Sequence, residues 1–217
     1  MNKISIICCI NNVDKYNEYT KKSFSALHDV EFIEIDNLDN KYSITQAYNI
    51  GKKQATGKYL VFAHQDIRML DSVDKFEKGL DDIFSLEEVG LVGFAGSKCI
   101  RNVEWWSTPP LYGKVKHWEG DLTFNKVNLF EEVIVVDGLG FVIPNRIKSI
   151  FNFDESFKWF HSYDLDVCLT LHFLGYKIGV FEFYMQHYPS GRFYGENWQE
   201  SCEVFYNKWS NKLPITI

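Results

Sequence analysis

Three consecutive residues in the first half of the chain have the types and spacing of a metal site. His64, Gln65 and Asp66 come directly after the apolar run Tyr59–Ala63, whose composition predicts a strand. A carboxylate oxygen is a preferred ligand of Mn²⁺ or Mg²⁺, and Mn²⁺ also accepts an imidazole nitrogen. This strand end would therefore suit a divalent cation bound between the protein and a diphosphate. The plainer alternative is a polar strand terminus at which Asp66 bonds the local backbone.

A second group of reactive side chains lies in the stretch HSYDLD, which begins at His161. Asp164 and Asp166 open an expected helix, where the helix dipole favours their ionised form. A carboxylate at the edge of a crevice can act as a general base toward a hydroxyl group. Helix capping without catalysis is the alternative, but the neighbouring His161 and Tyr163 favour the functional interpretation.

Three further features could contact a ligand. His187 precedes a loop that carries Arg192, so His187 is a candidate second metal ligand, and the forked donors of Arg192 could bind a phosphate. Their plainer roles are a structural histidine and a surface ion pair. Exposed indoles of Trp105 and Trp106 could stack on the apolar faces of sugar rings, although core filling beneath a long loop explains one of them equally well.

The elements that must position these residues alternate between strand and helix. Ser43 has capping-box spacing to Gln46, and Asp71 is placed to cap a second helix. A third helix is expected over Asp164–Leu174, ended by Gly175. Short apolar runs predict the strands, which are Ile4–Ile10, Glu31–Ile35, Tyr59–Ala63, Val89–Ala95, Val133–Val136, Phe141–Ile143 and Lys177–Phe181. This order predicts βαβ units and an α/β fold with a mostly parallel sheet.

Ligands of an open parallel sheet bind beyond the carboxyl ends of its strands. Three expected strand ends carry polar groups, at Asn11 with Asn12, at Asp36 and at His64, and these ends should converge at one crevice. Between residues 96 and 132 the alternation stops, in an expected long loop or hairpin excursion. The two halves, about 1–96 and 97–217, are expected to share one sheet within a single domain.

The composition argues against several classes of protein. The 217 residues carry 23 basic and 29 acidic side chains, a net charge of −6, without the basic block that nucleic-acid binding needs. No apolar run approaches the roughly 20 residues of a membrane helix. The run Ile4–Ile10 also lacks the basic leader and cleavage site of a signal peptide. We therefore expect no nucleic-acid partner and no transmembrane segment.

Two absent motifs and the cysteines argue against further protein classes and indicate the cellular location. No glycine-rich dinucleotide fingerprint follows the first strand and no GxxxxGK[ST] occurs, which disfavours Rossmann dehydrogenases and P-loop enzymes. The 5 cysteines are scattered, without a CxxC pair, and indicate a reduced protein. The expected location is the cytoplasm, with association at the inner face of a membrane left open.

From Ile4 to about Trp209, the order of these segments resembles the family 2-like glycosyltransferases of the GT-A fold. The stretch SITQAYNIGKKQATGKYLVFAHQDI is similar to the family's Tyr/Phe-Asn-x-Gly helix and metal-binding strand end, with His64-Gln65-Asp66 in place of Asp-x-Asp. The segment DGLGFVIPNR resembles the one that lines the acceptor side. FDESFKWFHSYDLDVCLTLHFLGYKIGVF resembles the acidic helix start with its following Gly turn and strand. A small subgroup of the family has a His-Gln-Asp metal motif.

The resemblance implies a GT-A type α/β/α sandwich with nucleotide-binding and acceptor-binding halves. The implied reaction moves a sugar from a nucleotide diphosphate sugar, in the first instance a UDP-sugar, to an acceptor hydroxyl, as in polysaccharide biosynthesis. The implied cofactor is Mn²⁺ or Mg²⁺, held by Asp66 and His187. Asp164 takes the place of the general base, with Asp166 as the alternative, and one base opposite the leaving group implies inversion. The implied donor-binding residues are Asn11, Asn12, Asp36, Asn49, His64, Gln65 and Arg192, and the implied acceptor-side residues are Trp105, Trp106, Gly138 and His161.

Two other interpretations stay open. A nucleotidyltransferase-like enzyme would move a nucleotide rather than a sugar, but CCINNVDKY lacks the Gly-rich basic loop that such enzymes usually carry. A non-catalytic nucleotide-sugar-binding module is compatible with His64 and Tyr163, which replace the family's usual acidic residues. The donor sugar, the acceptor (a sugar, a lipid-linked group or a protein) and the oligomeric state are not identified by the sequence.

Overall fold

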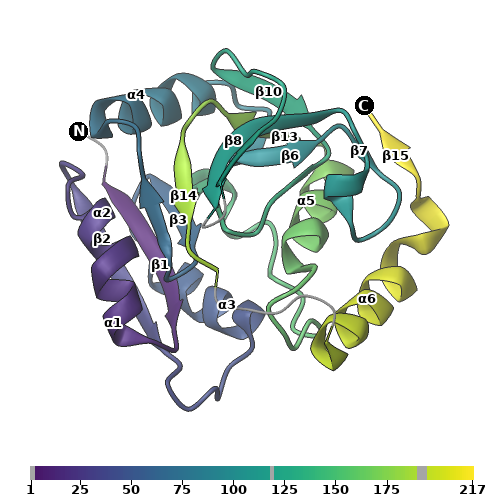
Figure 1. Cartoon of the computed structure of the whole chain (residues 1–217), viewed down its shortest axis with the longest axis horizontal. Helices are drawn as coiled ribbons and strands as arrows, with labels where there is room; N and C mark the ends of the chain where they lie inside the picture. Colours follow the sequence, from purple (N-terminus) through teal and green to yellow (C-terminus); the bar gives the residue numbers. More distant parts are fainter. Residues whose placement is uncertain (1–2, 118–119, 190–194) are drawn as a thin grey trace.

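The computed structural model describes all residues except 1–2, 118–119 and 190–194, and a seven-stranded sheet forms its centre (Figure 1). In spatial order the strands are β10 (Phe130–Val133), β13 (Lys177–Phe181), β5 (Val89–Gly93), β12 (Gly140–Pro144), β3 (Tyr59–Ala63), β1 (Ile4–Ile10) and β2 (Val30–Asp36). β1, β2, β3, β5 and β13 run in one direction, and β10 and β12 run in the other. The mostly parallel sheet predicted from the sequence is therefore confirmed.

Helices cover both faces of this sheet. The helices are α1 (Val13–Tyr16), α2 (Lys22–Phe24), α3 (Ile44–Gln54), α4 (Val73–Phe84), α5 (Tyr163–Phe173) and α6 (Glu196–Trp209), with a π-helical turn over Asn17–Lys21 and 3₁₀ turns at Trp105–Ser107, Asn145–Ile147 and Ser210–Lys212. Tyr16 of α1 packs with Cys8 and Ile10 of β1, whereas Gly51 of α3 lies against Ile7. Since successive strand residues point to opposite faces, α1 and α3 lie on opposite faces of the sheet.

The capping box predicted at the start of α3 is present. The Ser43 hydroxyl accepts a hydrogen bond from the Gln46 N–H, and the Gln46 side chain accepts one from the Ser43 N–H. The helix ends at Gln54, before the stop predicted at Gly57. Gly57 instead lies against β1, where its N–H donates to the Ser5 hydroxyl at 2.8 Å. A side chain at Gly57 would meet that hydroxyl and the nearby backbone.

The start of α4 differs by one residue from the sequence prediction. Ser72, not Asp71, caps the helix, and its hydroxyl accepts a hydrogen bond from the Lys75 N–H. Asp71 accepts a hydrogen bond from the backbone N–H of Tyr184 at 2.9 Å and pairs with the Lys75 ammonium at 2.7 Å. The predicted cap was wrong because Asp71 is engaged by a chain segment that is distant in sequence.

A second, smaller sheet combines strands from the region where the alternation of strand and helix stops with short strands from other parts of the chain. Its strands are β11 (Val135–Val136), β6 (Ala95–Ser97), β8 (Leu111–His117), β14 (Met185–His187) and β4 (Ile67–Met69), with β9 (Gly120–Thr123) paired to β8. β8 and β9 are antiparallel, so the excursion is a hairpin. A further short pair joins β7 (Cys99–Ile100) to β15 (Ile215–Thr216).

The single strand predicted over Val89–Ala95 is wrong, because the chain changes sheets at Phe94. β5 ends at Gly93 in the central sheet, and β6 begins at Ala95 in the second sheet. Gly113 of β8, with φ of +102°, lies with its Cα against the Phe94 carbonyl, where any side chain would clash. The apolar run continues through the crossing because Phe94 is fully buried there.

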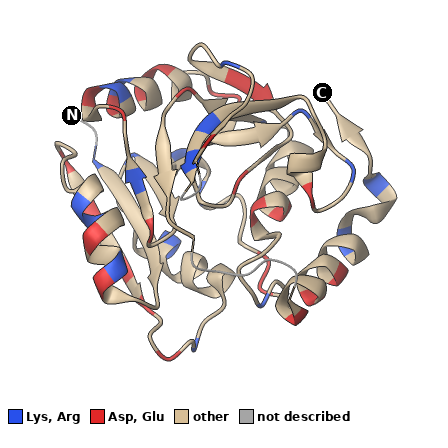
Figure 2. Cartoon of the chain, viewed as in Figure 1, with Lys and Arg blue, Asp and Glu red and all other residues tan. Residues whose placement is uncertain are grey.

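Charged residues of both signs are mixed on the outer helices (Figure 2). Along α4, Lys75 and Lys78 alternate with acidic residues, and Lys78 pairs with Asp82 one turn later. This helix therefore presents no block of one charge. Among the described residues, no helix has the length and apolar character needed to cross a membrane.

Candidate active site

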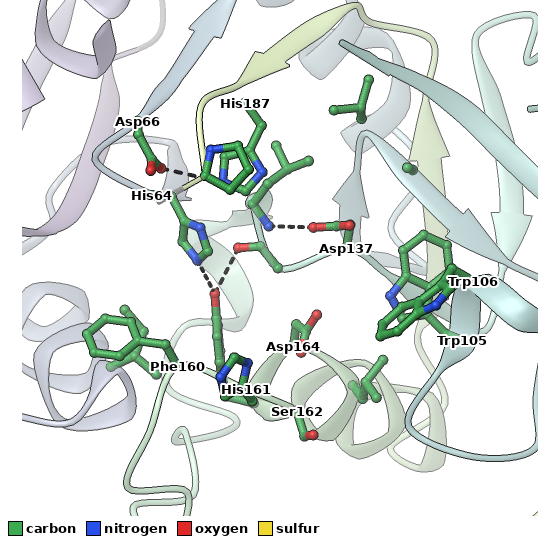
Figure 3. A pocket seen from close by; sticks show the side chains of 18 of the residues that line it. His64, Asp66, Trp105, Trp106, Asp137, Phe160, His161, Ser162, Asp164 and His187 are labelled. Atoms are coloured by element: carbon green, nitrogen blue, oxygen red, sulfur yellow. Dashed lines mark hydrogen bonds and ion pairs between the residues drawn. The ribbon is translucent and has the colours of Figure 1, made fainter. Parts of the chain in front are cut away.

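A cavity of about 610 Å³ opens beyond the carboxyl ends of β1 and β3. Asn11 follows β1, and His64 belongs to the turn that joins β3 to β4; both line the cavity. His187 at the end of β14 and Asp164 in the first turn of α5 line it as well (Figure 3). The structure thus brings residues from four distant parts of the chain to one crevice, at the edge where parallel sheets bind ligands.

His64, Asp66 and His187 form a cluster with the donor set of a metal site. One ligand atom from each lies within 4.8 Å of the other two. Burial, followed by the neighbouring His187, lowers the pKa of His64 to about 4, so its ring is neutral at neutral pH and keeps a lone pair. Burial would raise the pKa of Asp66, but hydrogen bonding to His187 and nearby charges lower it overall, so the carboxylate is ionised. A neutral imidazole and a carboxylate are the forms that bind a cation.

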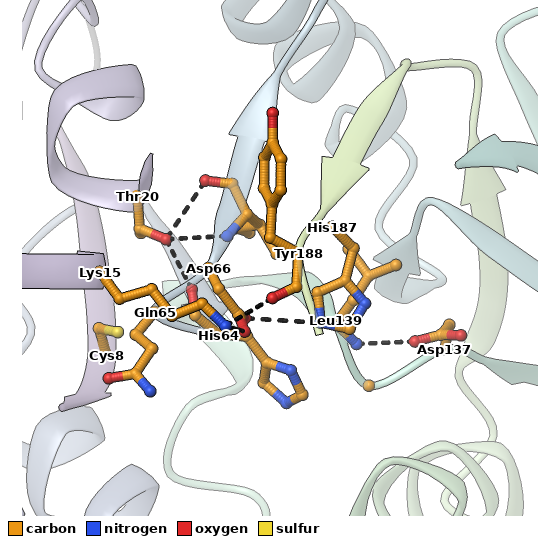
Figure 4. A network of polar contacts seen from close by, with 12 residues as sticks. Cys8, Lys15, Thr20, His64, Gln65, Asp66, Asp137, Leu139, His187 and Tyr188 are labelled. Carbon is orange, nitrogen blue, oxygen red and sulfur yellow. Dashed lines mark hydrogen bonds and ion pairs between the residues drawn. The ribbon is translucent and has the colours of Figure 1, made fainter. Parts of the chain in front are cut away.

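Lys15 adds a positive charge to this cluster, which the sequence analysis missed. Its ammonium lies 2.8 Å from Oδ2 of Asp66 and donates to the Tyr188 carbonyl at 2.6 Å (Figure 4). The other carboxylate oxygen of Asp66, Oδ1, lies 3.5 Å from Nε2 of His187. Lys15 belongs to α1, and the first turn of the helix after β1 necessarily lies near the strand ends, which is the signal that could have identified it.

The turn that carries the cluster is held by polar contacts from both sides. The Thr20 hydroxyl donates to the His64 carbonyl at 2.7 Å and accepts from the Ile67 N–H at 3.1 Å (Figure 4). On the other side, the Gln65 side-chain carbonyl accepts hydrogen bonds from the backbone N–H groups of Asn11 and Asn12, at 3.1 and 2.9 Å. Gln65 therefore links the end of β1 to the turn that carries His64 and Asp66.

Asp164 has the environment of a group that can take up a proton near neutral pH. Burial, followed by the negative charge of Asp137, raises the pKa of Asp164 to about 7, against the backbone N–H groups of Leu165, Asp164 and Gly138 that favour its ionised form. Asp137 lies on the same cavity wall and accepts a hydrogen bond from the Leu139 N–H at 2.8 Å. Burial is the larger cause of the raised pKa of Asp164, and the second carboxylate facing the same cavity adds to it by disfavouring double ionisation.

Tyr163, one residue before Asp164, is buried and contacts both His64 and Gly138. Its hydroxyl lies 2.9 Å from Nε2 of His64 and donates to the Gly138 carbonyl at 2.8 Å. A methyl group at Gly138 would lie 2.9 Å from both the Tyr163 hydroxyl and an Asp164 oxygen, so any side chain at this position would displace these two groups.

Asp166, the alternative base in the sequence analysis, is not a cavity residue. It accepts a hydrogen bond from the Trp209 indole at 2.8 Å and pairs with Lys208 at 2.8 Å. Residues two apart on a helix do not share a face, so Asp164 and Asp166 cannot both face the cavity. Asp166 instead fastens α6 to α5.

Three of the described residues predicted to bind the donor, Asn12, Asp36 and Asn49, do not line the cavity. Asn49 is buried, and its side chain bonds the backbone of Phe153, so it anchors the loop before α5. Asp36 is exposed at the end of β2, and Asn12 uses its side chain to cap α1. Arg192 lies outside the described residues.

The far wall of the cavity is aromatic. Trp105 is buried, whereas the side chain of Trp106 is 37% exposed at the rim. Ring centroids of Trp106 and Trp198 are 6.0 Å apart, and those of Trp198 and His161 are 5.2 Å apart. These residues and Gly138 all line the cavity. The core-filling alternative therefore applies to Trp105, and Trp106 is the indole that is open to a ligand.

His117 was also missed by the sequence analysis. It ends β8 and lines the cavity, with its ring centroid 5.5 Å from that of His187. Burial, followed by the neighbouring His187, lowers its pKa. No local pattern marks it, because its place depends on the pairing of β8 with β14.

Sequence comparison places this chain among known proteins. The family described as "Glycosyltransferase like family" matches residues 5–209, nearly the whole chain. The chain belongs to this family. A protein of Fuscovulum blasticum named "ATP synthase subunits region ORF 6" is 26% identical over 172 residues, which are 73% of this chain and 63% of that protein.

Solved structures show that this member of the glycosyltransferase-like family has the GT-A fold. GalNAc-T7 with UDP, GalNAc and Mn²⁺ superimposes with a TM-score of 0.61 at 10% identity, over 95% of this chain and 48% of that one. Staphylococcus aureus TarS 1–349 with UDP-GlcNAc superimposes with a TM-score of 0.57 at 12% identity, over 92% of this chain and 61% of that one. The mannosyltransferase PcManGT of Pyrobaculum calidifontis with GDP-Man and Mn²⁺ superimposes with a TM-score of 0.53 at 9% identity, over 82% of this chain and 56% of that one. The chain thus spans less than two thirds of each of these proteins.

Proposed function

We propose that the protein transfers a glycosyl group from a nucleoside diphosphate sugar, most simply a UDP-sugar, to a hydroxyl group of an acceptor. The observation that carries this proposal is the arrangement of one cavity in a glycosyltransferase-like chain. A cation-type cluster of His64, Asp66 and His187 lies on one side, and the carboxyl of Asp164, with its raised pKa, lies on another. UDP accompanies GalNAc-T7, and UDP-GlcNAc accompanies TarS, in two of the similar structures.

The residues present fit a divalent cation of the Mn²⁺ or Mg²⁺ type. Asp66 offers an ionised oxygen, and His64 and His187 offer nitrogens close enough to share one ion. When bound, the cation would stabilise the negative charge that develops on the leaving diphosphate. Mn²⁺ suits the mixed set of oxygen and nitrogen donors better than Mg²⁺ does, and Mn²⁺ accompanies GalNAc-T7 and PcManGT.

Lys15 would provide a second positive charge for the diphosphate. Its ammonium is held 2.8 Å from Asp66, beside the turn where the phosphates would lie. Once a cation occupies Asp66, the flexible stem of Lys15 allows the ammonium to move to a phosphate oxygen. Asn11 and Gln65, which are hydrogen bonded to each other, would line the nucleotide side of the same crevice.

Asp164 would take the proton from the acceptor hydroxyl as that oxygen attacks the anomeric carbon. A pKa near 7 leaves a useful fraction of the carboxylate ionised and still makes it a competent proton acceptor. Attack by the acceptor from the side opposite the leaving diphosphate would invert the configuration at that carbon. The aromatic wall with Trp106 would hold the acceptor, consistent with a nucleotide-binding half over about 1–96 and an acceptor-binding half over about 97–217.

A thermal-shift panel of UDP, GDP, CDP, dTDP and ADP, with and without Mn²⁺, tests the donor site. Ligand at about 100 times its Kd stabilises a protein by roughly 2.7 kcal/mol, which raises the midpoint of a chain of this size by several degrees. We expect a rise with one nucleotide that requires Mn²⁺ and is lost in Asp66→Ala. Asp164→Asn should keep that rise but lose transfer.

The same panel separates the competing functions. Nucleotide binding without hydrolysis or transfer of any nucleotide sugar would favour the binding-module interpretation. Release of pyrophosphate from a nucleoside triphosphate would instead favour a nucleotidyltransferase. Absence of any midpoint rise in folded protein would remove the basis of the proposal.

A further inference from the structure

One tyrosine hydroxyl connects the cation-type cluster to the general base. Tyr163 is 2% exposed and reaches His64 with its hydroxyl, while its chain neighbour is Asp164. The same hydroxyl donates to the carbonyl of Gly138, and the backbone N–H of Gly138 is one of the groups that favour the ionised form of Asp164. Gly138 therefore interacts with two consecutive residues of α5.

The direction of these hydrogen bonds determines which nitrogen of His64 carries its proton. A carbonyl oxygen can only accept, so the single hydroxyl proton of Tyr163 goes to Gly138 at 2.8 Å. The Tyr163 oxygen must then accept from His64, so Nε2, 2.9 Å away, carries the hydrogen. The reverse assignment would take the tyrosine proton away from the Gly138 carbonyl. The neutral ring consequently keeps its lone pair on Nδ1.

The free nitrogen is the one turned away from the tyrosine. In Figure 3 the dashed line from His64 uses one ring nitrogen, and the second ring nitrogen lies away from that contact. The ring centroid of His64 is 5.5 Å from that of His187, and Asp66 lies in the same cluster. Hydrogen bonding of the non-ligating nitrogen is the usual way in which a protein fixes the tautomer of a metal-binding histidine.

We propose that Tyr163 is a positioning residue that fixes His64 as the Nε2–H tautomer and so presents Nδ1 of His64 to a divalent cation. The inference deepens the proposed function, because it rests on a cation acting in this cavity. The tyrosine would also fix the position of Asp164 relative to His64. Its hydroxyl contacts both His64 and Gly138, and Tyr163 is the residue before Asp164 in α5.

The tautomer can be read without substrate, metal or turnover. Two-bond ¹⁵N–¹H correlation spectra of histidine-labelled protein distinguish Nε2–H from Nδ1–H, and the His64 signals are those missing from His64→Gln. We expect Nε2–H alone in the wild type and a mixture of tautomers in Tyr163→Phe. A wild type with Nδ1–H would overturn the proposal, even if the phenylalanine variant failed to fold.

Metal affinity provides the second readout, by titration of free Mn²⁺ followed by electron paramagnetic resonance. Loss of an outer hydrogen bond to a metal-binding histidine costs about 10–100-fold in affinity, and we expect a loss in that range for Tyr163→Phe. The matched control is Tyr59→Phe, which removes a buried tyrosine hydroxyl that bonds Asp81 at 2.6 Å, away from the cavity. This control should bind Mn²⁺ like the wild type.

The two proposals fail separately. If the tautomer and Mn²⁺ results are as expected but no nucleotide binds, then the positioning role stands and the glycosyl-transfer proposal falls. If nucleotide binding and transfer are found while Tyr163→Phe binds Mn²⁺ as tightly as the wild type does, then the tyrosine is only a structural residue.

Discussion

Replacing Asp164 by Asn should make the protein more stable at alkaline pH while it removes the proposed base. Asp164 has an ordinary pKa of 3.8 and a pKa of about 7 in the fold. Between those values the folded state binds more protons than the unfolded state, so the free energy of unfolding falls as the pH rises. The stabilising contribution of the protonated carboxyl is complete below about pH 4 and is lost as the pH passes about 7.

The size of this effect follows from the same pKa change, which corresponds to at most about 4 kcal/mol. Water in the cavity screens the half-buried carboxylate and reduces that figure. The asparagine side chain has one acceptor oxygen where the carboxylate has two, so the backbone N–H groups that favour the carboxylate are less well satisfied, which costs about 1 kcal/mol at every pH. The difference in pH dependence between the two proteins therefore isolates the ionisation of Asp164.

Urea unfolding of wild type and Asp164→Asn at about pH 5 and about pH 8 measures this difference. Asp164→Asn should gain stability relative to the wild type as the pH rises. Asp137→Asn removes the neighbouring negative charge, so its free energy of unfolding should change less with pH than that of the wild type. Wild-type kcat/KM should rise with pH and level off above about 7, and Asp164→Asn should lose about 10²–10⁴ in rate. Parallel stability profiles for wild type and Asp164→Asn would refute the buried-carboxyl reasoning.

Three further changes test other parts of the structure. Lys15→Met should weaken UDP binding roughly ten- to hundredfold and tighten nucleotide-free Mn²⁺ binding, as measured by calorimetry; equal effects of one sign on both ligands would contradict its placement beside Asp66. Trp106→Ala should raise the acceptor KM roughly fivefold, through loss of about 1 kcal/mol of stacking, with UDP affinity unchanged; a weaker UDP complex would place this indole on the donor side. Ser43→Ala should cost about 1 kcal/mol by loss of the capping box and lower the Tm by about 2–4 °C without altering UDP binding, so an unchanged Tm would mean that the cap does not stabilise α3.

Continuous apolar strands were the most predictable parts of the fold. The bounds of β1, β3 and β13 agree with the sequence prediction, because each is a short and mostly apolar segment between polar residues or turns. The division at Phe94 was not predictable, because the residue stays apolar and buried while the chain passes from one sheet to the other. Local hydrophobicity reports burial and does not report which sheet buries the side chain.

The candidate site was predictable where its residues follow a strand or begin a helix. His64 and Asp66 were found in this way, and Asp164 could have been separated from Asp166 by helical geometry alone, since residues two apart face different directions. Lys15 lies 51 positions before Asp66 and reaches it only in the folded chain. His117 likewise depends on the pairing of β8 with β14, and no short-range pattern encodes such contacts.

The ion pair between Lys15 and Asp66 implies that metal and nucleotide depend on each other thermodynamically. A cation that binds Asp66 alone must displace the lysine and then experiences its repulsion, and a diphosphate that draws Lys15 away leaves the Asp66 carboxylate uncompensated. When both are present, the negative diphosphate neutralises the lysine and the cation together, so each ligand should raise the affinity of the other by the same factor. The site would then bind a free cation or a free nucleotide weakly and would retain the two together.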